Sequence, residues 1–88
     1  MKQMHRIKHI PSGLYYSPGP SKLTPKGKIY HSVPDAITYF SNYIECKISL
    51  SVAKKLKENN LEHLISKDRY NQNVIKASIN QFEREQIN

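Results

Sequence analysis

The chain has 88 residues and a formal net charge of +7, which allows one domain with a thin core. It lacks the roughly 20 consecutive apolar residues of a membrane span, and no apolar stretch of the signal-peptide kind follows its basic start. Cys46 is the single cysteine, which excludes an intramolecular disulfide and indicates a reducing compartment. We therefore expect a single basic domain over residues 1–88, cytoplasmic, with no membrane contact, no cofactor and no metal.

The positive charge is concentrated in the N-terminal third. Residues 1–34 contain six lysines and arginines and no acid, whereas residues 35–88 contain all seven Asp and Glu residues. A one-sided basic charge is typical of proteins that bind nucleic acids. The abundance of Ile, Lys, Asn and Tyr, which AT-rich codons encode, is an alternative explanation of the high charge. The low apolar content also predicts a homodimer or a complex with a partner.

The first nine residues, Met1–His9, are interpreted as a basic arm that is frayed at its start. The following stretch is rich in proline, glycine and tyrosine. Within residues 13–32, two short apolar and aromatic runs, Gly13–Ser17 and Gly27–Ser32, predict two strands. The long Pro/Gly/Lys loop Pro18–Lys26 joins them.

Alternation along these two strands assigns their side chains to two faces. The core face holds Leu14, Tyr16 and Ile29. The opposite face holds Tyr15, Ser17, Lys28 and Tyr30. Tyrosines beside lysines suit a nucleic acid, because the rings stack on bases while the lysines hold phosphates, although aromatic residues are also common in sheets. With the basic arm and the loop, the predicted nucleic-acid-binding residues are Arg6, Lys8, Tyr15, Lys22, Lys26, Lys28 and Tyr30.

The runs Gly13–Tyr16 (GLYY) and Leu23–Tyr30 (LTPKGKIY) resemble small early proteins of T4-like bacteriophages. Those proteins often carry a Gly-x-Tyr strand followed by a Leu-Ser/Thr-x-x-Gly-Lys-x-Tyr segment. The resemblance implies a host-takeover or antidefence role, because such proteins commonly disable host enzymes or counter ribonuclease toxins of toxin–antitoxin pairs. It supplies no catalytic residue. A phage-encoded chain would act in the host cell cytoplasm.

Residues 34–87 are predicted to be mainly helical. An apolar stripe predicts a helix that begins near Pro34, and its members are Val33, Ile37, Phe40 and Ile44. The elements expected after it are a third strand over Glu45–Leu50, a helix over Val52–Asn59, an apolar turn over Leu61–Ile65 and a last helix over Asn73–Gln86. The predicted fold class is therefore α+β, with a small antiparallel sheet of two to three strands and about three helices packed on one face.

The histidines and Cys46 are the residues from which a metal or acid–base site could be built. The set His5, His9, His31 and Cys46 matches no zinc spacing. General acid–base chemistry of a metal-independent ribonuclease could come from His9, His31, Tyr30 and Lys28. No spacing distinguishes this group from chance, so we predict that the protein is not an enzyme and keep the ribonuclease as the least favoured alternative.

The sequence as a whole favours a small, basic, non-enzymatic protein that binds RNA or another nucleic acid. RNA is preferred because exposed tyrosines suit unpaired bases. The alternative is an inhibitor that docks on a host protein, such as a toxin–antitoxin ribonuclease, through the same basic surface. The two functions overlap, since an inhibitor could bind both the nuclease and its RNA.

Overall fold

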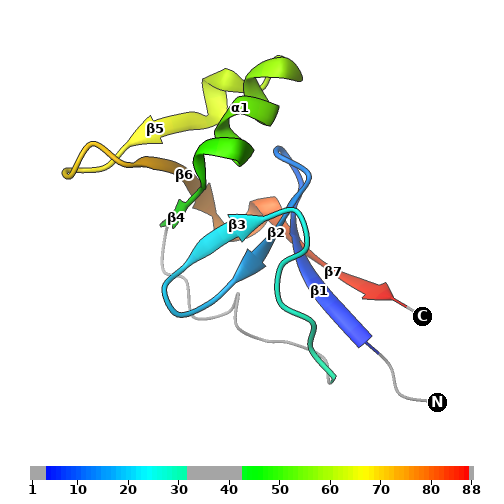
Figure 1. The fold of residues 1–88 in the computed structure, drawn as a ribbon. Helices are drawn as coiled ribbons and strands as arrows, with labels where there is room; N and C mark the ends of the chain where they lie inside the picture. Colours follow the sequence, from blue (N-terminus) through cyan, green and yellow to red (C-terminus); the bar gives the residue numbers. More distant parts are fainter. Residues whose placement is uncertain (1–3, 32–42, 88) are drawn as a thin grey trace.

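The computed structural model describes residues 4–31 and 43–87, in which seven strands form one mixed sheet beside one α-helix. The strands are β1 (Met4–His9), β2 (Leu14–Ser17), β3 (Lys22–Thr24), β4 (Tyr43–Lys47), β5 (Ile65–Lys67), β6 (Asn73–Ser78) and β7 (Phe82–Ile87). The helices are α1 (Leu50–Glu58) and the short 3-10 helices η2 (Glu62–Leu64) and η3 (Ile79–Gln81). The predicted fold of two to three antiparallel strands with three helices is therefore wrong, as is the mainly helical second half (Figure 1).

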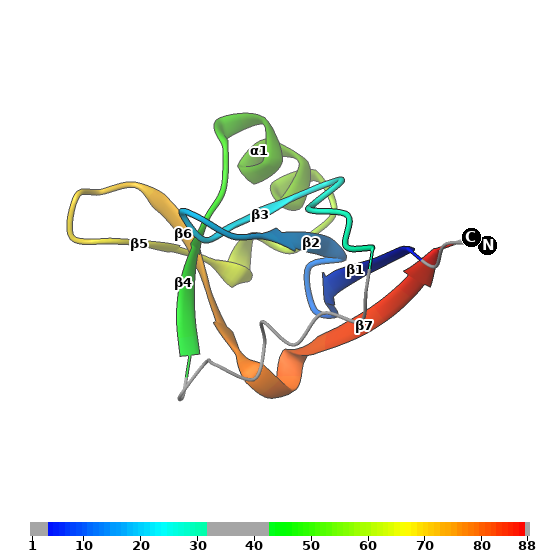
Figure 2. The same ribbon diagram turned by 90° about the horizontal axis from the view of Figure 1, so that it is seen from below.

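The sheet is strongly curved, because the connection between β6 and β7 is short. The strand order is β5-β6-β4-β3-β2-β1-β7, so five steps separate β6 from β7. In a flat sheet those steps would span about 24 Å at about 4.8 Å per strand. The three residues of η3 cover only about 6 Å. The sheet must therefore curl, and Figure 2 shows the corner at which β6 turns into β7.

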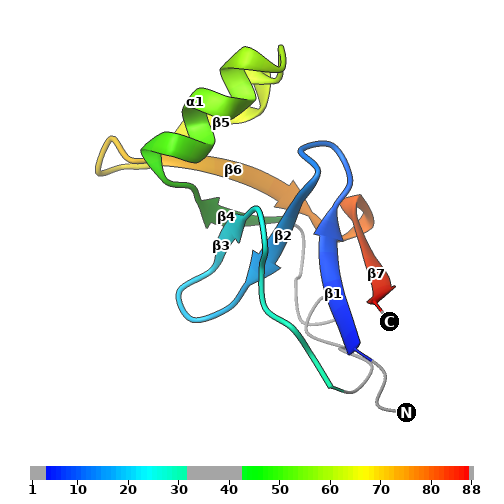
Figure 3. The same ribbon diagram turned by 45° about the vertical axis from the view of Figure 1, so that its right-hand side comes forward.

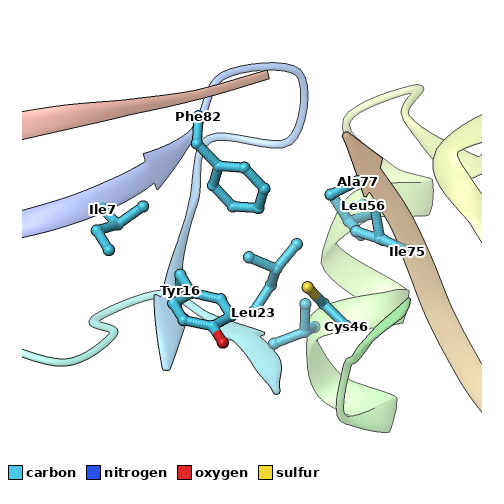
Figure 4. Close-up of a cluster of buried hydrophobic side chains, with 9 residues drawn as sticks. Ile7, Tyr16, Leu23, Cys46, Leu56, Ile75, Ala77 and Phe82 are labelled. Carbon is cyan, nitrogen blue, oxygen red and sulfur yellow. The ribbon is translucent and has the colours of Figure 1, made fainter. Parts of the chain in front are cut away.

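The inside of this curve holds the core. Its buried cluster is Ile7, Tyr16, Leu23, Cys46, Val52, Leu56, Ile75, Ala77 and Phe82. These side chains come from six of the strands and from α1, and Figure 4 shows them converging. The rings of Tyr16 and Phe82 meet edge to face with centroids 6.0 Å apart. β6 and β7, which are five steps apart in the sheet order, thus contribute to one core.

The segment interpreted as a basic arm, Met1–His9, contains β1, an inner strand of the sheet between β2 and β7. Its side chains alternate, so His5, Ile7 and His9 are buried. The interpretation was wrong because two of these three core-facing residues are histidines, which a hydrophobic pattern counts as polar. Backbone pairing to two neighbouring strands then decides the structure.

The first predicted strand, Gly13–Ser17, is confirmed by β2, with Tyr16 buried as expected. Its partner β3 lies inside the predicted loop Pro18–Lys26. Leu23 explains the difference, because its side chain is fully buried although prolines and lysines surround it in the sequence. One apolar residue is too short a signal to predict a strand.

The second predicted strand, Gly27–Ser32, is wrong for its described part. Tyr30 makes an isolated bridge with His5, in which two backbone hydrogen bonds measure 2.8 Å each. The Lys28 N–H donates to the Tyr16 carbonyl at 3.1 Å. The segment therefore crosses from β2 toward β1 without joining the sheet as a full strand.

The helix predicted from Pro34 lies mostly outside the described residues, and so do three members of its stripe, Val33, Ile37 and Phe40. The fourth member, Ile44, belongs to β4. The predicted third strand Glu45–Leu50 overlaps β4, which ends three residues earlier because Leu50 begins α1. The predicted third strand is therefore confirmed as a strand, but it lies closer to the N-terminus than expected.

The helix predicted over Val52–Asn59 is confirmed by α1. It begins two residues earlier because the Ser49 hydroxyl caps it, accepting the Val52 N–H at 3.2 Å. Val52, Ala53 and Leu56 are buried, so this face of the helix closes one side of the core. The exposed face carries the lysines, as expected of an amphipathic helix.

The helix predicted over Asn73–Gln86 is wrong, because this segment forms β6, η3 and β7. Its apolar residues Ile75, Ile79 and Phe82 have helical spacing, but Ile75 and Phe82 lie in different strands on either side of η3. β6 pairs with β4 and β5, and β7 pairs with β1. These long-range pairings override the local pattern.

Gln81 fixes the corner at η3. Its side-chain oxygen accepts the Ser78 N–H at 3.0 Å and lies 3.2 Å from Nε2 of His9. Because that oxygen can only accept, His9 donates through Nε2, and its Nδ1 lies 2.7 Å from the Ser12 hydroxyl. The Gln81 backbone carbonyl also accepts the Ile10 N–H at 2.9 Å. One residue thus joins the corner to the end of β1.

We expect Gln81→Ala to lower the free energy of unfolding by about 1–3 kcal/mol, because it leaves the buried His9 donor without its acceptor. Urea denaturation measures this change. The exposed Gln72 provides a matched control, and Gln72→Ala should change the free energy by less than about 0.5 kcal/mol. Equal denaturation midpoints for the two variants would contradict the role of the corner.

Candidate nucleic-acid interface

Arg6, Tyr15 and Glu85 form a polar cluster on the outer face of β1, β2 and β7. The Arg6 guanidinium donates to Glu85 Oε1 at 2.7 Å, and the Tyr15 hydroxyl donates to the same carboxylate at 3.0 and 3.1 Å. The guanidinium carbon also lies 3.8 Å from the centre of the Tyr15 ring. The hydrogen bonds from Arg6 and Tyr15 lower the pKa of Glu85, so the carboxylate stays charged and offsets Arg6.

The charge asymmetry of the sequence is therefore reduced by folding. β1 and β7 align with Arg6 opposite Glu85 and Lys8 opposite Glu83. The acids that are missing from the N-terminal third of the chain thus reach its basic residues through β7. A phosphate that approached this face would meet two carboxylates.

Lys26 and Lys28 lie on the exposed segment that follows β3. This segment passes very close to β2, because Gly27 adopts a φ of +67° and a Cβ at that position would overlap the Cβ of Tyr15. Glycine is the residue that tolerates both conditions. The Lys28 ammonium lies 5.0 Å from the centre of the Tyr30 ring, which holds it beside the fold.

Tyr30, the second predicted stacking residue, packs its ring against the core, and its hydroxyl oxygen is buried. Burial raises the pKa of this hydroxyl. The hydroxyl and the neighbouring His5 Nε2 are both buried without a hydrogen-bond partner among the described residues. We therefore expect Tyr30 to stabilise the fold rather than to stack on a base.

Lys22 lies opposite another lysine. The register of β3 and β4 places it directly beside Lys47, and both side chains are exposed. Like charges at opposed positions of a sheet repel by roughly 0.2–1 kcal/mol. An anion bound between the two ammonium groups would remove this repulsion.

A groove extends from this pair along α1. It consists of three joined hollows of about 360, 380 and 430 Å³. The first two share Lys47 and Ser49, and the last two share Pro25, Ser51 and Val52. The hollows therefore adjoin one another, from the β5–β6 hairpin to the turn between β1 and β2.

The charged side chains that line this groove are Lys22, Lys47, Lys55 and Lys67. Among the described residues that line it there is no Asp or Glu, and hydroxyl and amide groups supply the remaining polar surface. The first turn of α1 also lacks an acid, so the helix dipole adds to the positive potential. We call this surface the lysine groove.

Of the seven predicted binding residues, only Lys22 lines the lysine groove. Lys47 and Lys67 were not predicted as binding residues. Lys55 was expected only on the exposed lysine face of the helix, which is usually solvated but could extend a phosphate track. The alternation of Cys46 and Ile48 around Lys47 marks it as an exposed strand residue. The parallel pairing of β3 with β4, which brings it to Lys22, has no local signal.

Of the residues considered for metal or acid–base chemistry, His9 and Cys46 are buried, whereas His31 and Lys28 are exposed. His9 is 1% exposed, and both of its ring nitrogens are within hydrogen-bond distance of side chains. Cys46 is fully buried, and burial raises the pKa of its thiol to about 11. Within residues 4–31 and 43–87, no group of three or more His, Cys, Asp or Glu side chains could hold a metal ion.

Comparisons with known proteins leave the surface itself as the guide to function. No family model matches the chain, and searches for similar curated proteins and solved structures gave no match. In the part of the chain that the structure describes, no helix is long and apolar enough to cross a membrane.

We expect the protein to lose stability as the pH falls below about 6.5. Burial lowers the pKa of His9, so the unfolded chain takes up a proton that the folded chain resists. The stability is fully present above the ordinary histidine pKa and decreases as the pH falls toward the lowered value. Thermal melting between about pH 8 and about pH 5 measures the effect. A His9→Gln variant with an equally steep loss would assign it to another group.

Proposed function

We propose that this protein is a small, non-enzymatic nucleic-acid-binding protein with a preference for RNA, and that the lysine groove holds the sugar-phosphate backbone. The observation that carries this proposal is the gathering of four lysines along a surface whose described lining contains no carboxylate. Lysines attract phosphates of any sequence by releasing bound counterions. Hydroxyl and amide groups such as Ser51 and Asn71 can donate to phosphate and sugar oxygens.

The predicted binding residues are expected to contribute unequally to nucleic-acid binding. Lys22 is central because it lies opposite Lys47 in the groove. Lys26 and Lys28 extend the basic surface on the segment after β3. Arg6, Lys8 and Tyr15 contribute less, since each lies next to a β7 carboxylate or shares a hydrogen bond with one.

The biological role that we propose comes from the resemblance to early proteins of T4-like phages. It supports a phage-encoded protein that acts in the host cytoplasm against a host or defence factor. Binding of host RNA, or of RNA held by a host nuclease, would be the means. Capture of the protein with its ligands from infected cells tests this role.

A protein inhibitor is the second candidate, and Leu50 favours it. This leucine is 81% exposed and lines the same hollow as Lys47 and Lys67. An apolar side chain among lysines suits a protein partner that has an acidic rim around an apolar site. A pull-down with and without nuclease treatment discriminates the two candidates, since a stoichiometric host protein that survives nuclease supports the inhibitor.

We expect the double variant Lys22→Gln and Lys47→Gln to make RNA binding less dependent on salt. For single strands each phosphate contact contributes about −0.7 to the slope of log affinity against log salt, so the slope should become shallower by about 1.4. Fluorescence anisotropy with labelled host RNA between about 50 and 200 mM salt measures it.

The control removes the same charge from outside the groove, with Lys54→Gln and Lys57→Gln on the exposed face of α1. The slope of log affinity against log salt should change less than half as much in this control as in the Lys22 and Lys47 double variant. Equal changes in the two double variants would show that net charge, and not the groove, determines binding. Absence of binding at micromolar protein in low salt would refute the proposed function.

A further inference from the structure

Tyr70 is the most exposed aromatic residue among those described, at 69% of its surface. It lies at the tip of the hairpin that joins β5 and β6. A single exposed apolar residue is common on protein surfaces, so a role for Tyr70 depends on its turn, its neighbours and its position. Tyr70 is not among the binding residues predicted from the sequence.

The hairpin tip holds Tyr70 in a fixed position. One carboxylate oxygen of Asp68 accepts the N–H groups of Tyr70 and Gln72, both at 2.8 Å. The Asn71 N–H donates to the Asp68 carbonyl at 3.0 Å, and Asn71 has a φ of +62°. The turn is thus closed by its own hydrogen bonds, so the ring can bind a ligand with little loss of backbone freedom.

A cation lies against the Tyr70 ring. The Arg69 guanidinium carbon is 5.2 Å from the ring centroid, within the range of a cation–π contact. An aromatic ring beside an arginine is the arrangement on which proteins stack unpaired bases. The rings of Tyr15 and Tyr30, in contrast, are half-buried against the fold.

The hairpin tip adjoins the lysine groove. Asn71 lines the same hollow as Lys47, Lys67 and Leu50. Figure 3 shows the β5–β6 hairpin projecting beyond the first turn of α1. Leu50 in that turn and Asn71 in the hairpin line the same hollow. A strand whose phosphates bind Lys47 and Lys67 would therefore carry its next bases toward Tyr70.

We propose that Tyr70 is a base-stacking residue at one end of the lysine groove, and that the ligand is a single strand with unpaired bases. This inference rests on the proposed function. A duplex keeps its bases stacked on one another and offers the ring no free face except at its ends. Arg69 lies beside the ring and strengthens the stacking.

Tyr43 provides a matched control. It is 59% exposed, and the Lys76 ammonium lies 6.0 Å from its ring centroid. Neither tyrosine lines the lysine groove itself. Tyr43 pairs with Ser78 at the opposite end of β4 from Lys47, whereas Asn71, the residue after Tyr70, lines the same hollow as Lys47. It therefore shares the exposure and the cation of Tyr70 without its position.

The test compares Tyr70→Ala, Tyr70→Phe and Tyr43→Ala by anisotropy, with a short uridine-rich RNA as a single strand and annealed to its complement. We expect Tyr70→Ala to weaken single-strand binding about tenfold or more and to leave the salt slope unchanged, because no charge is removed. Tyr70→Phe and Tyr43→Ala should stay within about twofold of wild type. Equal melting temperatures confirm that the variants fold.

Two results would overturn the inference while the proposed function stands. One is equal single-strand affinity of Tyr70→Ala and Tyr43→Ala. The other is a wild-type protein that binds the duplex as tightly as the single strand, with Tyr70→Ala weakening both alike. If the wild-type protein bound neither RNA, the proposed function itself would be lost, and this inference with it.

Discussion

The hydrogen bonds of Gln81 hold the corner that makes the sheet curl, and the position of the lysine groove follows from that curl. Because β6 passes into β7 within three residues, Ile75 and Phe82 reach one core cluster from strands that are five steps apart in the sheet order. α1 packs on this cluster through Val52 and Leu56. The helix is thereby set beside β3 and β4, whose lysines form the groove with it.

The same curl determines which basic residues lie beside a carboxylate and which do not. It brings β7 to β1, so Arg6 meets Glu85, a residue 79 positions away in the chain. The outer face of β1 and β2 loses much of its positive potential in this way. Lys22 has a different neighbour, because the parallel pairing of β3 and β4 places it beside Lys47. Folding therefore places carboxylates beside the basic residues of β1 and a second lysine beside Lys22.

Local signals could be predicted from the sequence, and long-range pairings could not. α1 was predicted because its apolar face and its terminal asparagines lie within one short segment. β1 was missed because His5 and His9 occupy core positions, and β6 and β7 were missed because their apolar residues have helical spacing. Lys22 was found as a basic residue, but its partner Lys47 depends on a strand pairing that no local pattern contains.

Amide chemical-shift mapping by NMR tests the central claim, that the lysine groove binds single-stranded nucleic acid, most directly. Titration of the labelled protein with a short uridine-rich RNA should shift the amides around Lys22, Lys47 and Ser49 and those of the hairpin near Asn71. The amide signal of Glu85, on the outer face of β7 where its carboxylate pairs with Arg6, should shift little. Shifts centred on Glu85 and the outer face of β1, or no shifts at saturating RNA, would contradict the claim.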